Sequence, residues 1–248
     1  MKLAPAGIIG KINPKEFGYL CPNGVINFQT EESAIKFAKC AIVKELKATG
    51  KELGVITKDS RVLKSIQGDE ERVLMPLNDI PDIRGCAYHH GHPDFYKGIA
   101  SSFSPRDAKS FLILNKVLGY NKYFVYNQLG EECSMEFKPS RVLDFLPRNL
   151  RYLLFQFNPL TSIKFSNIDR ATHKFEKGAD VKSYLRKITP EDIKVYKNIA
   201  TNGSEKDKKD LKDLLMAKFK ASLGHQATRD FAPKIGADYK TNFSYIVD

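Results

Sequence analysis

The chain has 248 residues, of which 42% are hydrophobic, so it can bury one sizeable core and a smaller second unit. It contains no run of about eighteen apolar residues, and Pro5, Gly7 and Pro14 interrupt the segment where a signal peptide would lie, so we expect a soluble, unexported protein without a membrane partner. The net charge of +11 favours a polyanionic partner, such as nucleic acid or a phosphate-bearing ligand.

Cysteine spacing and missing motifs narrow the classes of protein further. The four cysteines form no CxxC pair, which fits reduced thiols in a cytoplasmic protein better than a disulfide framework. The chain also lacks the GxxxxGK[ST], GxGxxG, GxSxG and HExxH motifs. The common nucleotide-binding, dinucleotide-binding, serine-hydrolase and zinc-protease classes are therefore not expected.

The first predicted helix starts near residue 31. A Pro-Asn-Gly turn signal at 22–24 and a strand-like stretch at 25–28 precede it. Thr30 is the expected N-cap, and Gly50 is the expected end of the helix. Apolar residues recur at helical spacing, so we expect one face of this helix to pack on a core.

The other face of this helix carries Glu32, Lys36 and Lys39, which lie four and seven positions apart and form one charged stripe. The stripe is either a solvated surface, with a Glu32–Lys36 pair that contributes about 0.2–0.5 kcal/mol, or the wall of a binding site. The helix dipole favours negative charge in the first turn, so we expect the Glu32 carboxyl group to be ionised.

The elements after residue 50 are predicted from apolar spacing and turn residues. Two short segments are expected at 52–56 and 60–66, followed by a proline-containing loop at 74–85. Two helices are expected at 92–103 and 104–120, a strand at 121–128 and an apolar helix at 141–157. Two further capped helices are expected at 189–201 and 204–223, in a lysine-rich part of the chain.

The densest cluster of metal-ligating residue types is the stretch CAYHHGHPD at 86–94, which contains His89, His90 and His92. Such a cluster can supply zinc ligands, or an H-x-D pair for iron. A structural zinc site needs a second ligand pair, however, and only two histidines lie elsewhere in the chain. We therefore predict no metal and no cofactor, and keep a metal-dependent nuclease built on these three histidines as an alternative.

Several short motifs occur in a consistent order between residues 17 and 157. They are FGYLCPN at 17–23, TEESAIKFAK at 30–39, VITKDSRVLKSI at 55–66, YHHGHPDFYKGIASSF at 88–103 and PRNLRYLLFQF at 147–157. Together they resemble the NADAR superfamily of N-glycosidases, which is related to enzymes that cleave riboflavin-pathway intermediates and ADP-ribosylated nucleotides.

The resemblance implies a site that contains Glu32 and Lys39 as catalytic residues. Cleavage of an N-glycosidic bond builds positive charge on the ribose, and an ionised carboxylate such as that of Glu32 stabilises this charge and orients water. Lys39, with Lys36 as a weaker candidate, would hold a phosphate or diphosphate of the ligand. Tyr88 would stack on the base or ribose, and Asn149 would hydrogen-bond a sugar hydroxyl.

We therefore expect an α+β, mainly helical fold with a NADAR-like catalytic domain at 1–157 and a basic helical C-terminal extension at 158–248. The expected function is hydrolysis of the N-glycosidic bond of a ribosylated nucleotide, for example ADP-ribose on a nucleic-acid base, with an ADP-ribose-like or phosphoribosyl ligand as partner. The first alternative is a non-enzymatic, coat-like nucleic-acid-binding protein that uses its net charge of +11. The second is the metal-dependent nuclease.

Overall fold

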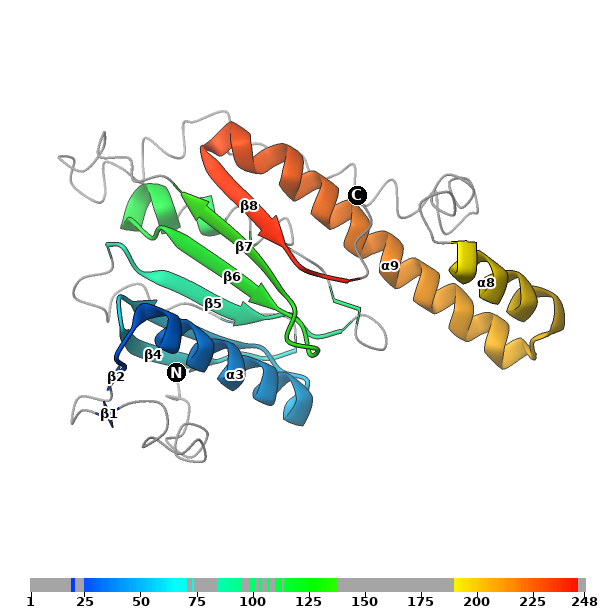
Figure 1. Cartoon of the computed structure of the whole chain (residues 1–248), viewed down its shortest axis with the longest axis horizontal. Helices are drawn as coiled ribbons and strands as arrows, with labels where there is room; N and C mark the ends of the chain where they lie inside the picture. The colour runs from blue at the N-terminus through cyan, green and yellow to red at the C-terminus, as the bar shows by residue number, and fades with distance from the viewer. Residues whose placement is uncertain are drawn as a thin grey trace.

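The structure is a computed structural model, and it describes residues 19–20, 25–70, 73, 84–94, 99–100, 103, 107, 110–112, 114–137 and 190–244. Its centre is an eight-stranded sheet with the order β1-β2-β4-β3-β5-β6-β7-β8. The strands are β1 (Tyr19–Leu20), β2 (Ile26–Asn27), β3 (Leu53–Lys58), β4 (Arg61–Gln67), β5 (Ala87–Gly91), β6 (Lys122–Tyr126), β7 (Glu132–Phe137) and β8 (Ala237–Thr241). Figure 1 shows the sheet with its helices.

The prediction of a mainly helical fold is wrong, because this mixed sheet forms the core of an α+β arrangement. Strands β5 and β6 are parallel, whereas the other neighbouring pairs are antiparallel. The central strands β3 and β5 are buried almost throughout, on both faces. A strand covered on both sides shows no alternation of apolar and polar residues, and this is why its sequence pattern does not reveal it.

Among the described residues, three α-helices accompany the sheet: α3 (Glu31–Thr49), α8 (Pro190–Asn202) and α9 (Glu205–Phe231). The predicted limits of α3 are confirmed, since the Thr30 side chain accepts a hydrogen bond from the Ser33 N–H and Gly50 adopts a left-handed conformation with φ 68°. The predicted helices at 189–201 and 204–223 are α8 and α9, although α9 continues to Phe231. No helix among the described residues is long and apolar enough to cross a membrane.

The sheet has a different cover on each face. Helix α3 packs its apolar stripe, including Phe37, Ile42 and Leu46, on one face together with Val55 of β3. The opposite face is covered by the chain between β5 and β6, which contains the π-helical turn η1 (Leu114–Leu118), and by the C-terminal part of α9. A parallel strand pair requires such a crossover connection, so the order of the strands determines which residues lie over this face.

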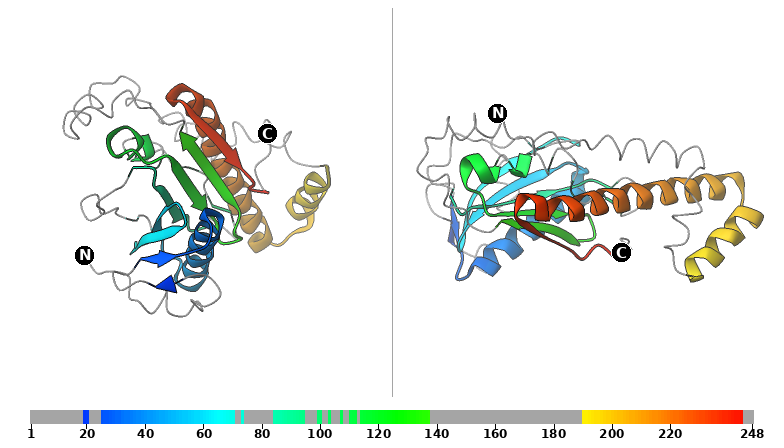
Figure 2. Two further views of the ribbon diagram at one scale, coloured as in Figure 1. Left: turned by 60° about the vertical axis from the view of Figure 1, so that its left-hand side comes forward. Right: turned by 90° about the horizontal axis from the view of Figure 1, so that it is seen from above.

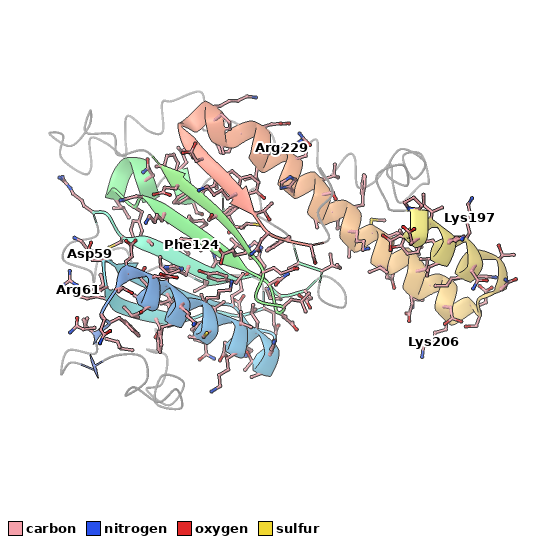
Figure 3. All side chains as sticks on the ribbon, in the orientation of Figure 1. Asp59, Arg61, Phe124, Lys197, Lys206 and Arg229 are labelled. Atoms are coloured by element: carbon pink, nitrogen blue, oxygen red, sulfur yellow. The ribbon has the colours of Figure 1, made fainter. Side chains whose placement is uncertain are left out.

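The N-terminal part of α9 extends beyond the sheet and packs against α8 (Figures 1 and 2). Tyr196 of α8 and Phe219 of α9 are buried between the two helices. Lys197 and Lys206 lie on this helical pair, away from the sheet (Figure 3). The predicted domain boundary at residue 157 falls outside the described residues, but β8 pairs with β7, so residues 237–241 belong to the same sheet as residues 132–137.

Helix α3 lies close to β5 because Gly91 has no side chain. A Cβ atom at this position would lie 2.6 Å from Leu46 Cδ1 and 2.7 Å from Ile42 Cγ2. We expect Gly91→Ala to lower the free energy of unfolding by about 1–3 kcal/mol, since overpacking a core forces neighbours out of their rotamers. Urea denaturation measures this loss, and the same substitution in an Ile42→Ala background should cost less, whereas an equal cost in both backgrounds would contradict the close contact.

Candidate metal centre

Two histidines share one face of the sheet at the end of β5. Side chains alternate along a strand, so His90 and His92, which are two positions apart, point to the same side. Their Nε2 atoms are 2.9 Å apart, and both side chains are buried. The face they occupy is the one covered by the crossover from β5 to β6, because Tyr88, two residues before His90, packs in the cluster formed by that crossover.

Asp107, which lies in this crossover, places its carboxylate beside both histidines. Its Oδ1 atom is 3.2 Å from His90 Nε2, and its Oδ2 atom is 3.1 Å from His92 Nε2. The donor atoms of the three residues all lie within 4.8 Å of one another, a grouping that can hold a metal ion. Around tetrahedral Zn²⁺, with ligand distances of about 2.0–2.2 Å, neighbouring ligand atoms are about 3.3–3.6 Å apart, so these three separations are slightly shorter than those of one coordination sphere and a small outward shift would accommodate the ion.

Hydrogen bonding alone accounts poorly for this convergence. Each Nε2 atom carries at most one hydrogen and can direct it at only one neighbour, although His90 and His92 each meet two. Protonation of both rings at Nε2 would bring two N–H groups against each other at a heavy-atom distance of 2.9 Å. A cation between them instead receives both Nε2 lone pairs and one carboxylate oxygen. Stacking on Tyr88, with ring centroids 5.6 Å apart, orients the His90 ring.

A second carboxylate, that of Glu52, is buried near these three residues and interacts electrostatically with them. Continuing the antiparallel register in which Gly54 pairs with His90 places Glu52 opposite His92. Only 6% of Glu52 is exposed. Burial raises the pKa of Glu52, and the nearby His90 and His92 oppose this shift. Burial alone would also raise the pKa of Asp107, but His92 and His90 hold it well below its usual range.

The charges of this cluster favour a divalent cation. The carboxylates of Glu52, which is buried, and of Asp107, which is 15% exposed, lie near two imidazoles, and an uncompensated buried charge is strongly unfavourable. A divalent ion bound by two neutral histidines and one carboxylate would neutralise both acidic groups. The site is therefore suited to a transition-metal ion with mixed nitrogen and oxygen ligands.

His89, the third histidine of the predicted cluster, lies on the opposite face and does not join the other two. Its Nε2 atom is 2.9 Å from Thr57 Oγ1, and its Nδ1 atom is 2.9 Å from the Tyr126 hydroxyl. Its ring stacks on Phe124, which Figure 3 shows in the sheet, with centroids 4.6 Å apart. Burial lowers the pKa of His89 to about 3, so this histidine is a neutral core residue beneath α3.

The residues predicted from the NADAR resemblance lie elsewhere. Glu32 and Lys36 are exposed on α3, on the other side of the sheet from His90. Lys39 forms an ion pair with Glu132 at 3.0 Å and lies over the Tyr126 ring. The catalytic and binding roles of these three residues remain predictions.

Tyr88 is buried in the core beside His90, with 2% of it exposed, and its predicted stacking on a base or ribose stays a prediction. Asn149 lies outside the described residues. The structure thus places one residue of the predicted substrate site, Tyr88, next to His90, one of the three histidines predicted as the alternative metal site.

Asp107 and Glu52 are the functional candidates that sequence reasoning missed. Asp107 occurs in the stretch SPRD, fifteen positions after His92, and no local motif connects the two. Glu52 precedes a strand whose pairing with β5 cannot be inferred from its own sequence. The H-x-H spacing of His90 and His92 was the one usable signal, because it places two imidazoles on one face of an extended chain.

Comparisons with known proteins assign no family. No protein-family model matches the chain, and no curated protein or solved structure is significantly similar to it. The resemblance to the NADAR superfamily therefore remains a prediction, and the chemistry of the site is argued from its own geometry.

Proposed function

We propose that the chain is a divalent-metal-dependent hydrolase whose ion is bound by His90, His92 and Asp107. The observation that carries the proposal is the convergence of two imidazole nitrogens and a carboxylate, at separations of 2.9, 3.2 and 3.1 Å, on one buried face of the sheet. Two histidines and one carboxylate form a ligand set typical of catalytic zinc sites, which keep a further position for water or substrate. A structural zinc site more often has four protein ligands.

Each residue has a distinct part in the proposed reaction. His90 and His92 would hold a divalent ion through Nε2, and Asp107 would offset its positive charge. The bound ion would supply Lewis-acid chemistry, which polarises a substrate oxygen and makes water more acidic. Glu52, opposite His92 in the sheet, accepts the proton of the attacking water and returns it to the leaving group.

The net charge of +11 supports an anionic substrate, and a phosphodiester is the class that unites it with a metal centre. This is the chemistry of the metal-dependent nuclease considered from the sequence, with Asp107 and Glu52 in place of His89. The nucleic-acid-binding alternative shares the charge but requires no metal. The N-glycosidase alternative, built on Glu32, is also independent of metal.

The test is hydrolysis of bis(p-nitrophenyl) phosphate by the full chain before and after complete removal of metal. We expect the Zn²⁺-loaded protein to release p-nitrophenol, the chelated protein to be inactive, and one equivalent of Zn²⁺ to restore turnover. Undiminished turnover without metal, or failure to bind metal at all, would refute the proposal. Release of ADP-ribose from an ADP-ribosylated oligonucleotide by the metal-free protein would support the Glu32 site instead.

A further inference from the structure

We propose that the Tyr88 hydroxyl is a second electrophilic group of this centre, which donates a hydrogen bond to the substrate oxygen that gains negative charge during hydrolysis. The inference rests on the proposed function, and it concerns the phosphoryl oxygen of the proposed phosphodiester; a carbonyl substrate is the other outcome of the test below. It also gives Tyr88 a role different from stacking on a base.

The direction of the Tyr88 side chain supports this role. In the register of β3 and β5, Tyr88 pairs with Ile56 and His90 pairs with Gly54. The Tyr88 hydroxyl nevertheless lies over Gly54, since a Cβ atom there would be 2.8 Å from the hydroxyl oxygen. The ring therefore leans along the sheet from its own position toward that of His90. Glu52 follows in the same direction: it lies two positions before Gly54, just before β3 begins, and on the same face of the sheet.

The hydroxyl lies against Gly54, and the Tyr88 ring is held in place by its neighbours. The Val73 Cγ2 atom would lie 3.0 Å from a Cβ atom at Gly54, so a methyl group and a bare backbone carbon border this position. The Tyr88 ring stacks on the His90 ring and contacts the Tyr123 ring at 5.1 Å between centroids. A donor fixed by packing in this way needs no rearrangement when charge develops in front of it, which is the condition for effective electrostatic stabilisation.

The hydroxyl is buried, and it has no hydrogen-bond partner among the described residues. A buried hydroxyl without a partner destabilises a fold, and natural proteins seldom keep one without a functional reason. Phenylalanine would fill the same volume without this cost. A substrate oxygen bound beside His90 would supply the missing acceptor.

In the proposed step water is the nucleophile, and Glu52 carries its proton to the leaving group. The oxygen of water forms a bond to the carbonyl carbon or phosphorus, and its proton passes to Glu52. The electron pair of the double bond moves to the substrate oxygen, which accepts a hydrogen bond from Tyr88. Collapse of this species breaks the bond to the leaving group, which takes the proton from Glu52. Tyr88 keeps its own proton throughout, so it acts as a hydrogen-bond donor and not as an acid.

The experiment compares wild type with Tyr88→Phe, each loaded with Co²⁺, whose visible absorption reports on its ligands. The probes are acetohydroxamate for a carbonyl-type oxyanion and inorganic phosphate for a phosphoryl-type one. We expect Tyr88→Phe to bind Co²⁺ as tightly as wild type but to bind one of the probes about tenfold more weakly, the effect of losing one hydrogen bond to a charged group. The probe that loses affinity identifies the substrate class.

The thermal stability of the Tyr88→Phe variant is a second measurement. Removal of a hydroxyl that stabilises the fold through a hydrogen bond would lower the melting temperature. Because Tyr88→Phe removes an unpartnered buried hydroxyl, its melting temperature without substrate should rise by about 2–4 °C. The matched control is Tyr126→Phe, on the opposite face, whose hydroxyl bonds His89 Nδ1 at 2.9 Å. This control should melt at a lower temperature and keep the wild-type affinity for both probes.

Two outcomes separate the failure of this inference from that of the proposed function. Equal affinity of wild type and Tyr88→Phe for both probes, or no binding of either probe to Co²⁺-loaded wild type, would overturn the role of Tyr88 and leave the metal centre intact. Failure of wild type to bind Co²⁺ would overturn the metal centre and the inference together.

Discussion

The His90→Ala variant is expected to bind no Zn²⁺ at concentrations where wild type binds one equivalent. His90 supplies one of three converging donor atoms, and its loss leaves only His92 and Asp107, which are 3.1 Å apart. Zn²⁺ at a hundred times its dissociation constant should stabilise wild type by about 2.7 kcal/mol and leave the variant unchanged. Isothermal titration calorimetry measures the binding, and thermal unfolding with and without Zn²⁺ measures the stabilisation.

His225→Gln is the matched control for this prediction. His225 is also buried, but it lies on α9 and contacts the Tyr239 hydroxyl through Nδ1 at 2.9 Å. Its replacement should lower stability without changing the stoichiometry of Zn²⁺. His92→Ala and Asp107→Asn should behave as His90→Ala does. Retention of wild-type Zn²⁺ affinity by all three ligand variants would show that the ion binds elsewhere.

Glu52→Gln should retain Zn²⁺ and lose turnover of bis(p-nitrophenyl) phosphate by about 10²–10⁴-fold, the contribution typical of a positioned general base. Glutamine has nearly the same shape as glutamate, so packing beside His92 is preserved. Its amide accepts no proton, so it cannot act as the general base. Because the substitution removes a buried carboxylate, the metal-free variant should be at least as stable as wild type. Steady-state kinetics on protein with measured metal content provide the test.

Glu45→Gln controls for the loss of a buried glutamate. Glu45 is 4% exposed, lies on α3 across the sheet, and accepts hydrogen bonds from the Thr49 hydroxyl and the Gln67 amide. We expect its replacement to change stability and not kcat. If Glu52→Gln instead turned over the substrate as fast as wild type, another group would have to accept the proton.

Helices α3 and α9 could be predicted from the sequence because their capping residues act locally, whereas the helix predicted at 92–103 is wrong, since none of the described residues in that range is helical. Thr30 caps α3, and Gly50 ends it in a left-handed conformation. Ser204 and Asp207 form the capping box that starts α9, with the Ser204 side chain accepting from the Asp207 N–H and the Asp207 carboxylate accepting from the Ser204 N–H. Such capping signals involve only four or five neighbouring residues, so they can be recognised without knowing the tertiary contacts of the helix.

The sheet could not be predicted in the same way. Strands β5, β7 and β8 were missed, and the histidines of β5 were assigned to no element, although all five residues of that strand are buried. The strand at 121–128 was found because the aromatic and β-branched residues of β6 are types enriched in strands. The pairing of β3 with β5, whose continued register places Glu52 opposite His92, joins residues about 30–36 positions apart. No local pattern encodes that distance.

The pairing of β7 with β8 has a consequence for synthesis. Phe137 pairs with Ala237, a hundred positions further along the chain, so at about 5–20 residues per second a ribosome leaves that edge open for about 5–20 s. An open edge can recruit a foreign strand, and charged side chains discourage this. Glu132 and Glu136, both on β7, supply like charges that would repel the same strand of a second nascent copy until β8 has been synthesised.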